Sequence, residues 1–219
     1  GVGDMLVSFL RVEGWLPIFV GEDIAKSLSR PSYRGMYVHF PLMILSVIIA
    51  AFSRSLGFIW LSLLIVIAEL AIVFTRFIFS YEQAFMGDLV RFWYGALFLF
   101  ASAYTLLEEG HVRVDVFYSA FKPKRKGLIN AVGSIILGLS MSWTIMLVGM
   151  GTKMAIINMP VVNFEVSQSG YGMYVKYLMA AFLGIFAVTM AIQFVSYFLD
   201  SVADYRGQPG KRNPAPPSG

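Results

Sequence analysis

The stretch LINAVGSIILGLSMSWTIMLVGM, residues Leu128–Met150, contains 23 consecutive residues and no charged side chain. An α-helix needs about 20 mostly apolar residues to cross the hydrocarbon core of a bilayer. The stretch is therefore predicted to be a transmembrane helix. The uncharged stretch Tyr177–Leu199 predicts a second span of the same length. A third is predicted near Leu89–Leu107, where Arg91 lies close enough to the helix end to reach the interface.

Two further apolar stretches precede these three spans. Ser55–Phe79 carries Glu69 near its middle and Arg76 near its end, whereas Gly35–Ser53 holds His39 and Pro41 near its start. Because only a few residues join the two stretches, they form either a tight helical hairpin or one long tilted helix. The sequence thus predicts an all-α fold, a polytopic transmembrane helix bundle with four to five spans plus interfacial helices, and five spans are favoured.

The composition agrees with residence in a membrane. Of 219 residues, 58% are hydrophobic and 14% are charged, and the mean hydropathy is +0.70. Soluble domains average about 45–50% apolar and about 25% charged residues, so an ordinary soluble domain is excluded. The continuous apolar runs exclude an outer-membrane barrel, whose strands alternate in polarity. The lack of cysteine excludes disulfide scaffolds, thiolate metal sites and cysteine nucleophiles.

These patterns divide the chain into four parts. Residues 1–34 are predicted to form an N-terminal interfacial segment, since the apolar run Met5–Val20 is too short and too interrupted by charge to span. No basic segment precedes that run, which argues against a signal peptide. Residues 35–54 are predicted to be an extra N-terminal span and residues 55–200 the main membrane domain. Residues 201–219 are predicted to be a disordered cytoplasmic tail.

The lysines and arginines predict the orientation. The densest basic run, Lys122–Lys126, lies between the third and fourth predicted spans, and such residues are retained on the cytoplasmic side. The C-terminus is then cytoplasmic, and Ser80–Asp88, which has no lysine or arginine, lies outside. A nucleic-acid partner is not expected, because no recognition motif surrounds the basic run.

The sequence carries no motif for catalysis or for a cofactor. Its two histidines are His39, near the start of a predicted span, and His111, in a predicted cytoplasmic loop. They are too few and too differently placed for paired haem ligation, and neither stands in a metal-binding motif. No phosphate-binding loop, dinucleotide fingerprint or nucleophile elbow is present. We therefore expect neither an enzyme nor a bound cofactor or metal.

Glu69 is the most costly residue of the predicted spans. A carboxylate near the middle of a membrane suggests an ion site or a proton relay, but it can also be protonated or paired with a partner subunit. Arg76 lies seven residues further on and therefore on about the same helical face. It either holds a partner or lipid, or simply extends toward the interface.

The most distinctive motif follows the third span and reads Gly110-His111-Val112-Arg113-Val114-Asp115. A basic turn and two spans follow this motif, and it is preceded by Arg76, Asp88, Arg91, Trp93 and Gly95. With these features in this order, the chain resembles the small membrane subunit of tripartite ATP-independent periplasmic (TRAP) transporters, the DctQ-like family. The resemblance covers about residues 58–199. The family often has Glu where Asp88 stands, and its shortest members have four spans and no counterpart of the first 53 residues.

The resemblance implies a scaffold subunit without catalytic residues. Its partners would be the large TRAP membrane subunit (M-type), which moves like an elevator and holds the substrate and sodium sites, and a periplasmic solute-binding protein (P-type) that delivers an organic acid. The implied location is the bacterial inner membrane. Candidate partner or lipid contacts are Glu69, Arg76, Asp88, Arg91 and Trp93. Gly110, His111, Arg113 and Asp115 would stabilise the cytoplasmic turn. The alternative is an autonomous small ion-coupled channel or exporter that uses Glu69.

Overall fold

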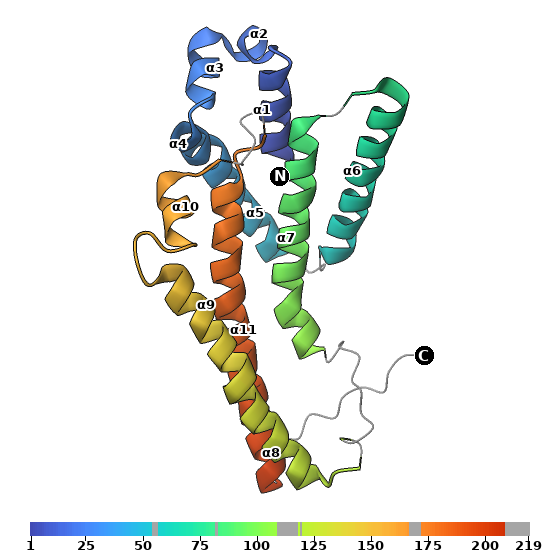
Figure 1. The fold of residues 1–219 in the computed structure, drawn as a ribbon, viewed down its shortest axis with the longest axis vertical. Helices are drawn as coiled ribbons and strands as arrows, with labels where there is room; N and C mark the ends of the chain where they lie inside the picture. The colour runs from blue at the N-terminus through green and yellow to red at the C-terminus, as the bar shows by residue number, and fades with distance from the viewer. Residues whose placement is uncertain (54–56, 82, 109–117, 119, 167–171, 209–219) are drawn as a thin grey trace. The chain divides into compact units, whose positions relative to one another are not determined.

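The computed structural model describes residues 1–53, 57–81, 83–108, 118, 120–166 and 172–208. Every regular element in these ranges is a helix, which confirms the all-α prediction (Figure 1). In chain order they are α1 (Val2–Val12), α2 (Leu16–Val20), α3 (Glu22–Leu28), α4 (Pro31–Arg34), η1 (Gly35–His39), α5 (Phe40–Phe52), α6 (Phe58–Phe79), α7 (Ala84–Leu107), α8 (Pro123–Gly133), η2 (Ser134–Leu139), α9 (Ser140–Met150), α10 (Asn158–Asn163) and α11 (Lys176–Arg206).

Five helical stretches of the described residues are long and apolar enough to cross a membrane. They are Pro31–Phe52, Phe58–Phe79, Phe85–Leu107, Pro123–Met150 and Lys176–Arg206. The two N-terminal stretches are separate helices, so the structure agrees with two spans and not with one long helix. The predicted polytopic bundle is therefore confirmed, with five candidate spans.

The first candidate span contains one turn of π-helix, the element η1. Pro41 lies at the start of α5, and a proline inside a helix has no N–H to donate and crowds the carbonyl four residues earlier. The chain widens just before it, and the N–H of Phe40 donates to the carbonyl of Gly35, five residues back. The wider turn keeps the helix continuous and contains His39, a residue of the site described below.

The described chain divides into two compact units. The first consists of Gly1–Ala101 and Thr152–Leu183. Its main core is apolar and joins α6, α7 and the segment that leads into α11. The buried members are Ile65, Ala68, Phe85, Leu89, Val90, Phe92, Trp93, Met173 and Val175, and Met5 and Phe9 of α1 pack against them. The N-terminal helix is thus part of this core.

A smaller core holds α2 and α3 against α1 and α4. It is built from Leu16, Ala25 and Leu28. The region predicted as interfacial, residues 1–34, is therefore a folded set of short helices with a core of its own. Trp15, just before α2, and Ile18 and Phe19 on α2 remain exposed. Aromatic and aliphatic side chains of this kind suit the interface of a membrane.

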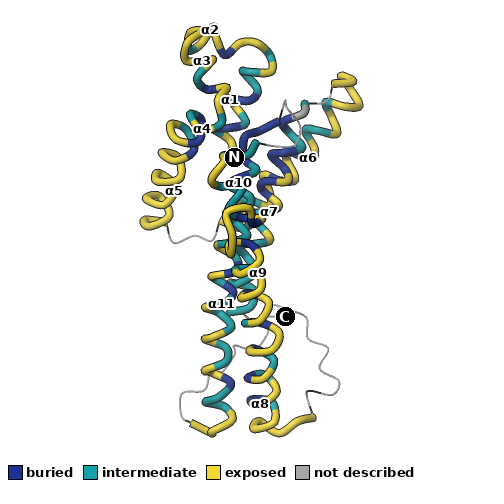
Figure 2. Tube along the Cα trace, turned by 60° about the vertical axis from the view of Figure 1, so that its left-hand side comes forward, coloured by how far each residue is buried: buried dark blue, intermediate teal, exposed yellow. Residues whose placement is uncertain are grey.

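In contrast, α5 has no buried residue along its whole length (Figure 2). Its sequence, FPLMILSVIIAAF, contains no charged side chain. A helix that is apolar on all sides and uncovered by its own chain is stable only in lipid or against another protein. This exposure agrees with a membrane environment for the first candidate span.

The second unit consists of Ser102–Gly151 and Gly184–Gly219. Here α8, η2 and α9 run as one helix against α11, with small residues at the contact. Ser134, Gly138 and Ser142, which recur every four residues, are all buried. A Cβ atom at Gly138 would lie 2.3 Å from the ring of Phe194. Small residues of this kind let membrane helices approach closely, as their spacing predicts.

Candidate functional site

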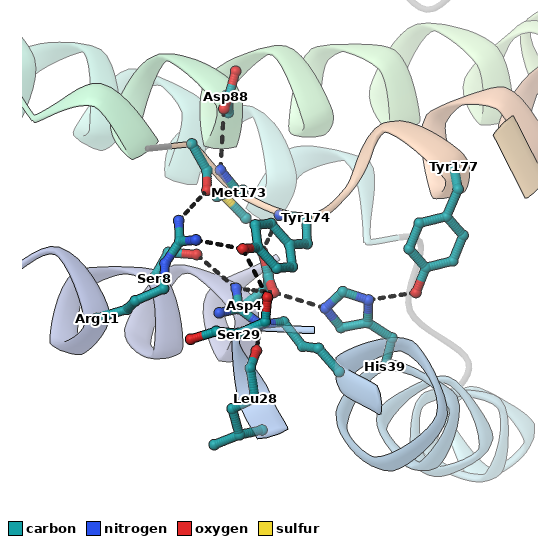
Figure 3. Close-up of polar contacts among 12 residues, drawn as sticks. Asp4, Ser8, Arg11, Leu28, Ser29, His39, Asp88, Met173, Tyr174 and Tyr177 are labelled. Carbon is teal, nitrogen blue, oxygen red and sulfur yellow. Dashed lines mark hydrogen bonds and ion pairs between the residues drawn. The ribbon is translucent and has the colours of Figure 1, made fainter. Parts of the chain in front are cut away.

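The described residues contain one group of buried charged and hydrogen-bonding side chains that draws on distant parts of the chain (Figure 3). All of it belongs to the first unit. We call it the polar cluster and define it by six residues: Asp4, Ser8, Arg34, His39, Tyr174 and Tyr177. They come from α1, α4, η1, the segment just before α11 and the first turn of α11.

Asp4 lies at the centre of the polar cluster and is 2% exposed. Its Oδ1 atom accepts hydrogen bonds from Arg34 Nη1 at 3.1 Å and from His39 Nε2 at 2.8 Å. Its Oδ2 atom accepts the backbone N–H of Tyr174 at 2.9 Å. Because both oxygens have donors, the carboxylate can remain charged although it is buried.

Arg34 is fully buried at 0% exposure. Besides Asp4, its guanidinium donates to Ser8 Oγ at 3.0 Å, and its Nε donates to the Leu28 carbonyl at 3.0 Å. The guanidinium carbon lies 4.0 Å from the centroid of the Tyr174 ring, within range of a cation–π contact. The remaining nitrogen, Nη2, is buried and has no hydrogen-bond partner among the described residues. The ion pair with Asp4 is therefore the main compensation for burying this charge.

His39 connects the ion pair to the last candidate span. Its Nδ1 shares a hydrogen bond with the hydroxyl of Tyr177, and the two rings stack with centroids 5.7 Å apart. An ionised carboxylate only accepts, so Nε2 carries the hydrogen that points to Asp4. In the neutral imidazole, Nδ1 then accepts the hydrogen of Tyr177. The arrangement thus satisfies both nitrogens of His39 without a second charge.

Tyr174 is held on several sides. Its ring lies beneath Arg34, and its hydroxyl accepts a hydrogen bond from Arg11 Nη1 and donates to the Ser29 carbonyl at 3.1 Å. Arg11 also donates to the Gly172 carbonyl at 3.0 Å. These contacts tie the segment before α11 to helices α1 and α3.

A second carboxylate fixes the neighbouring residue of the same segment. Asp88 of α7 accepts the backbone N–H of Met173 at 3.1 Å, whereas Asp4 accepts that of Tyr174. Two consecutive amides therefore donate to carboxylates from two different helices. The start of α11 is held between α1 and α7 by this pair of bonds.

The chemistry of the polar cluster favours a structural role. Its members are donors and acceptors for one another, and no group of three metal-ligating side chains occurs among the described residues. Burial alone would raise the pKa of the Asp4 carboxyl. The hydrogen bond from His39 and the charge of Arg34 outweigh this effect, so that the pKa lies below its ordinary value of 3.8. Asp4 is therefore an anion across the neutral range.

The lowered pKa predicts how Asp4 contributes to stability as pH changes. As the pH falls, the carboxyl of the unfolded chain takes up a proton near its ordinary pKa of 3.8, and the folded carboxyl does so only at a lower pH. The contribution of Asp4 to stability is therefore complete above pH 3.8. It is lost as the pH falls through the lower folded pKa. We expect the difference in melting temperature between the parent chain and Asp4→Asn to shrink below about pH 4. Thermal unfolding in detergent at stepwise lower pH measures this difference.

The exposed Asp23, on α3, provides the control, since Asp23→Asn should change the melting temperature little at any pH. A difference between the parent chain and Asp4→Asn that stays constant down to pH 2 would contradict a lowered pKa for Asp4.

The residues singled out in the sequence occupy different places. Glu69 and Arg76 are exposed on α6. Asp88 is 8% exposed, and its Oδ1 lies 3.7 Å from a nitrogen of the exposed Arg91. Trp93 lies in the core of the first unit, where it contacts this chain's own residues.

The structure therefore brings together only Asp88 and Arg91 from the predicted set. The turn motif, made up of Gly110, His111, Arg113 and Asp115, lies outside the described residues.

The polar cluster is not apparent from the sequence. There His39 is of interest only as a possible haem or metal ligand, and nothing singles out Arg34 or Tyr174. One signal was available for Asp4, which is the single charged residue among residues 1–10. Such charges are rarely buried unless they are paired.

The comparison with protein families identifies the chain. The model of the DctQ component of tripartite ATP-independent periplasmic transporters matches residues 63–203. No significant match was found among curated proteins or among solved structures. Asp88, Tyr174 and Tyr177 lie within the matched region, whereas Asp4, Arg34 and His39 precede it. The match covers well over half of the chain and agrees with its apolar helices, so this multi-pass inner-membrane protein belongs to the DctQ component family of TRAP transporters.

Proposed function

We propose that this chain is the small scaffold subunit of a TRAP-type secondary transporter. In this proposal it supports a large elevator-type membrane subunit (M-type) during the sodium-coupled uptake of an organic acid. A periplasmic solute-binding protein (P-type) delivers the substrate. Family membership makes the chain a transporter component that associates with other TRAP subunits. The scaffold role and the identity of the partner subunits are proposed in addition to what family membership shows.

The observation that carries the proposal is the small buried fraction of the candidate spans. In the most apolar window of each, only 11% to 22% of the residues are buried within the chain. Most of the apolar surface is left for lipid or for other subunits. A scaffold needs a wide surface of this kind, whereas an enzyme or a channel needs an enclosed site.

The proposed topology follows from the basic run Lys122–Lys126, which is placed in the cytoplasm together with the C-terminus. Five spans then put residues 1–34 and the polar cluster on the periplasmic side, where a solute-binding protein docks. Residues 35–54 would be the extra N-terminal span, residues 55–200 the DctQ-like domain and residues 201–219 a cytoplasmic tail. The first six residues of that tail, up to Arg206, are the end of helix α11.

The exposed members of the predicted set retain their proposed role as partner or lipid contacts, namely Arg76, Arg91 and Glu69. Asp88 would act through Arg91 and through the Met173 amide that it binds. Trp93 is buried in the core and would contribute indirectly, by holding α7 in the position from which Arg91 makes its contact. The motif residues Gly110, His111, Arg113 and Asp115 would stabilise the cytoplasmic turn.

Co-purification tests the proposal. We expect the chain, expressed together with the large subunit and extracted in a mild detergent, to elute with that subunit as one complex. We also expect sodium-driven uptake in proteoliposomes to require both subunits and the binding protein. Recovery of this chain only as a monomer or homodimer, while the large subunit is present, would contradict the proposal.

The autonomous channel is the other candidate function. Glu69 is exposed on the surface of α6 and is not enclosed by other helices of the described chain, which favours a contact between subunits over an ion-coupling site. Flux from the reconstituted chain alone, abolished by Glu69→Gln, would instead support the channel.

A further inference from the structure

Glu69 lies at the middle of the most apolar candidate span. Helix α6 has 22 residues, and Glu69 has eleven before it and ten after it. At the rise of an α-helix this span is about 33 Å long, close to the thickness of the hydrocarbon core. In a bilayer that α6 crosses, Glu69 would therefore lie near the middle of the hydrocarbon core.

One side of α6 is already used by the chain itself. Ile65 and Ala68 are 3% and 5% exposed, and Leu61 and Ile72 pack against the same core. Glu69 is exposed although Ile65, its neighbour one turn earlier, is buried. Glu69 thus lies at the border of the packed side, beside a surface that no other helix of the first unit covers.

Arg76 extends the same face toward the end of the helix. Seven residues fall about 20° short of two full turns, so the two side chains point in nearly the same direction. Both are exposed, and neither has a hydrogen bond or ion pair within the described residues. We call the side of α6 that carries Ser62, Glu69 and Arg76 the acidic face, after Glu69 at the middle of the helix.

The chemistry of the acidic face selects among three possible neighbours. Lipid chains offer no donor to a carboxyl group, so exposure to lipid at this depth is costly. A second copy of this chain related by a two-fold axis along the membrane normal would place the two Glu69 carboxyls at equal depth, where like charges repel. A helix of a different protein with a basic or amide side chain at mid-depth satisfies the carboxylate.

We propose that the acidic face of α6 is a docking surface for a transmembrane helix of the large subunit, which presents a lysine, arginine, histidine or amide side chain opposite Glu69. This inference rests on the proposed scaffold function and adds to it the surface that makes the contact. Buried polar contacts between membrane helices give specificity as well as affinity, so Glu69 would fix the register of the two proteins.

Two neighbouring positions test the surface without altering Glu69. Ser62 and Leu63 are exposed at nearly the same depth, and Ser62 lies on the acidic face, whereas Leu63 points about 100° away from it. The natural chain has no cysteine, so Ser62→Cys and Leu63→Cys each introduce one reactive group. With a short photo-crosslinker on that cysteine, we expect Ser62→Cys to link to the large subunit at least five times as efficiently as Leu63→Cys.

Substitution of Glu69 tests the charge. We expect Glu69→Leu to leave the isolated chain monodisperse, with an unchanged or higher melting temperature, and to reduce recovery of the complex at least tenfold. Glu69→Gln keeps a hydrogen-bonding group and should reduce recovery less. The control Phe74→Leu, on an exposed position away from the acidic face, should recover as much complex as the parent chain.

The outcomes separate this inference from the proposed function. Failure of the parent chain to co-purify with the large subunit would contradict the scaffold role. Full recovery of the complex with Glu69→Leu, together with equal crosslinking from both cysteines, would overturn the docking surface alone. A crosslink between two copies of this chain would overturn it in favour of a homodimer. Crosslinking from Ser62→Cys supports the surface even where a Glu69 variant fails to fold.

Discussion

Replacing Arg34 with leucine is expected to lower the free energy of unfolding by about 3–5 kcal/mol, the usual effect of removing one member of a buried ion pair. Arg34 is fully buried and donates to Asp4, Ser8 and the Leu28 carbonyl. Its loss leaves the Asp4 carboxylate buried with a weaker set of donors. The expected result is therefore larger than the loss of one hydrogen bond, which contributes about 1 kcal/mol.

Thermal or denaturant unfolding in detergent, followed by tryptophan fluorescence, measures the effect. The matched control is Arg30→Leu, four residues earlier and exposed, which should change the stability by less than about 0.5 kcal/mol. The double variant Asp4→Leu with Arg34→Leu should lose less than the sum of the two single variants, because neither charge is then left alone. Strict additivity would show that the two residues do not act as a pair.

The part of the chain that opens when Arg34 is replaced can be located as well. Ala25 lies in the small core beside Leu28, whose carbonyl accepts from Arg34. A cysteine introduced there should react slowly with a maleimide in the parent chain and much faster in the Arg34→Leu background. Equal rates in both backgrounds would mean that the N-terminal helices do not depend on Arg34.

Two glycines of helix α8 are expected to respond to alanine with opposite signs. A Cβ atom at Gly127 would lie 2.7 Å from the Ser201 carbonyl oxygen and 2.8 Å from the Tyr205 nitrogen. Both atoms belong to the backbone of α11, so the two helices must separate. At Gly133 a Cβ atom would meet nothing within 4 Å.

Alanine exceeds glycine by about 1 kcal/mol in helix propensity, so Gly133→Ala should raise the stability by up to that amount. At Gly127 the same gain is opposed by overpacking, which costs about 1–3 kcal/mol, and a larger residue such as leucine should separate the helices completely. Melting temperatures of both variants in one detergent provide the measurement. A rise for Gly127→Ala equal to that of Gly133→Ala would show that α8 and α11 are not in close contact.

The spans could be predicted from sequence because they depend on local composition. An uncharged run such as Leu128–Met150 is long enough to cross a bilayer whatever it packs against. The small residues Ser134, Gly138 and Ser142 recur every four residues and therefore lie on one side of the helix, a pattern that is visible in the sequence itself. Helix spans and close helix contacts are therefore accessible to reasoning from residue order alone.

The polar cluster could not be predicted in this way. Asp4 is separated from Arg34 by 30 residues and from the Tyr174 amide by 170. Nothing local to α1 shows which cation or which amide will reach its carboxylate. Trp93 is a similar case, since the family resemblance implied a contact with a partner or with lipid. In the folded chain, α1 packs on the same core and helps to enclose it.

The polar cluster also has a consequence for where the chain can be shortened. Its carboxylate, guanidinium and imidazole come from before the region shared with the family, whereas its tyrosines come from within that region. Removing the first helices would leave the Tyr174 amide without the Asp4 carboxylate and the Tyr177 hydroxyl without His39. The N-terminal helices and these two tyrosines therefore depend on each other, and a shortened chain would expose both of these polar groups at once.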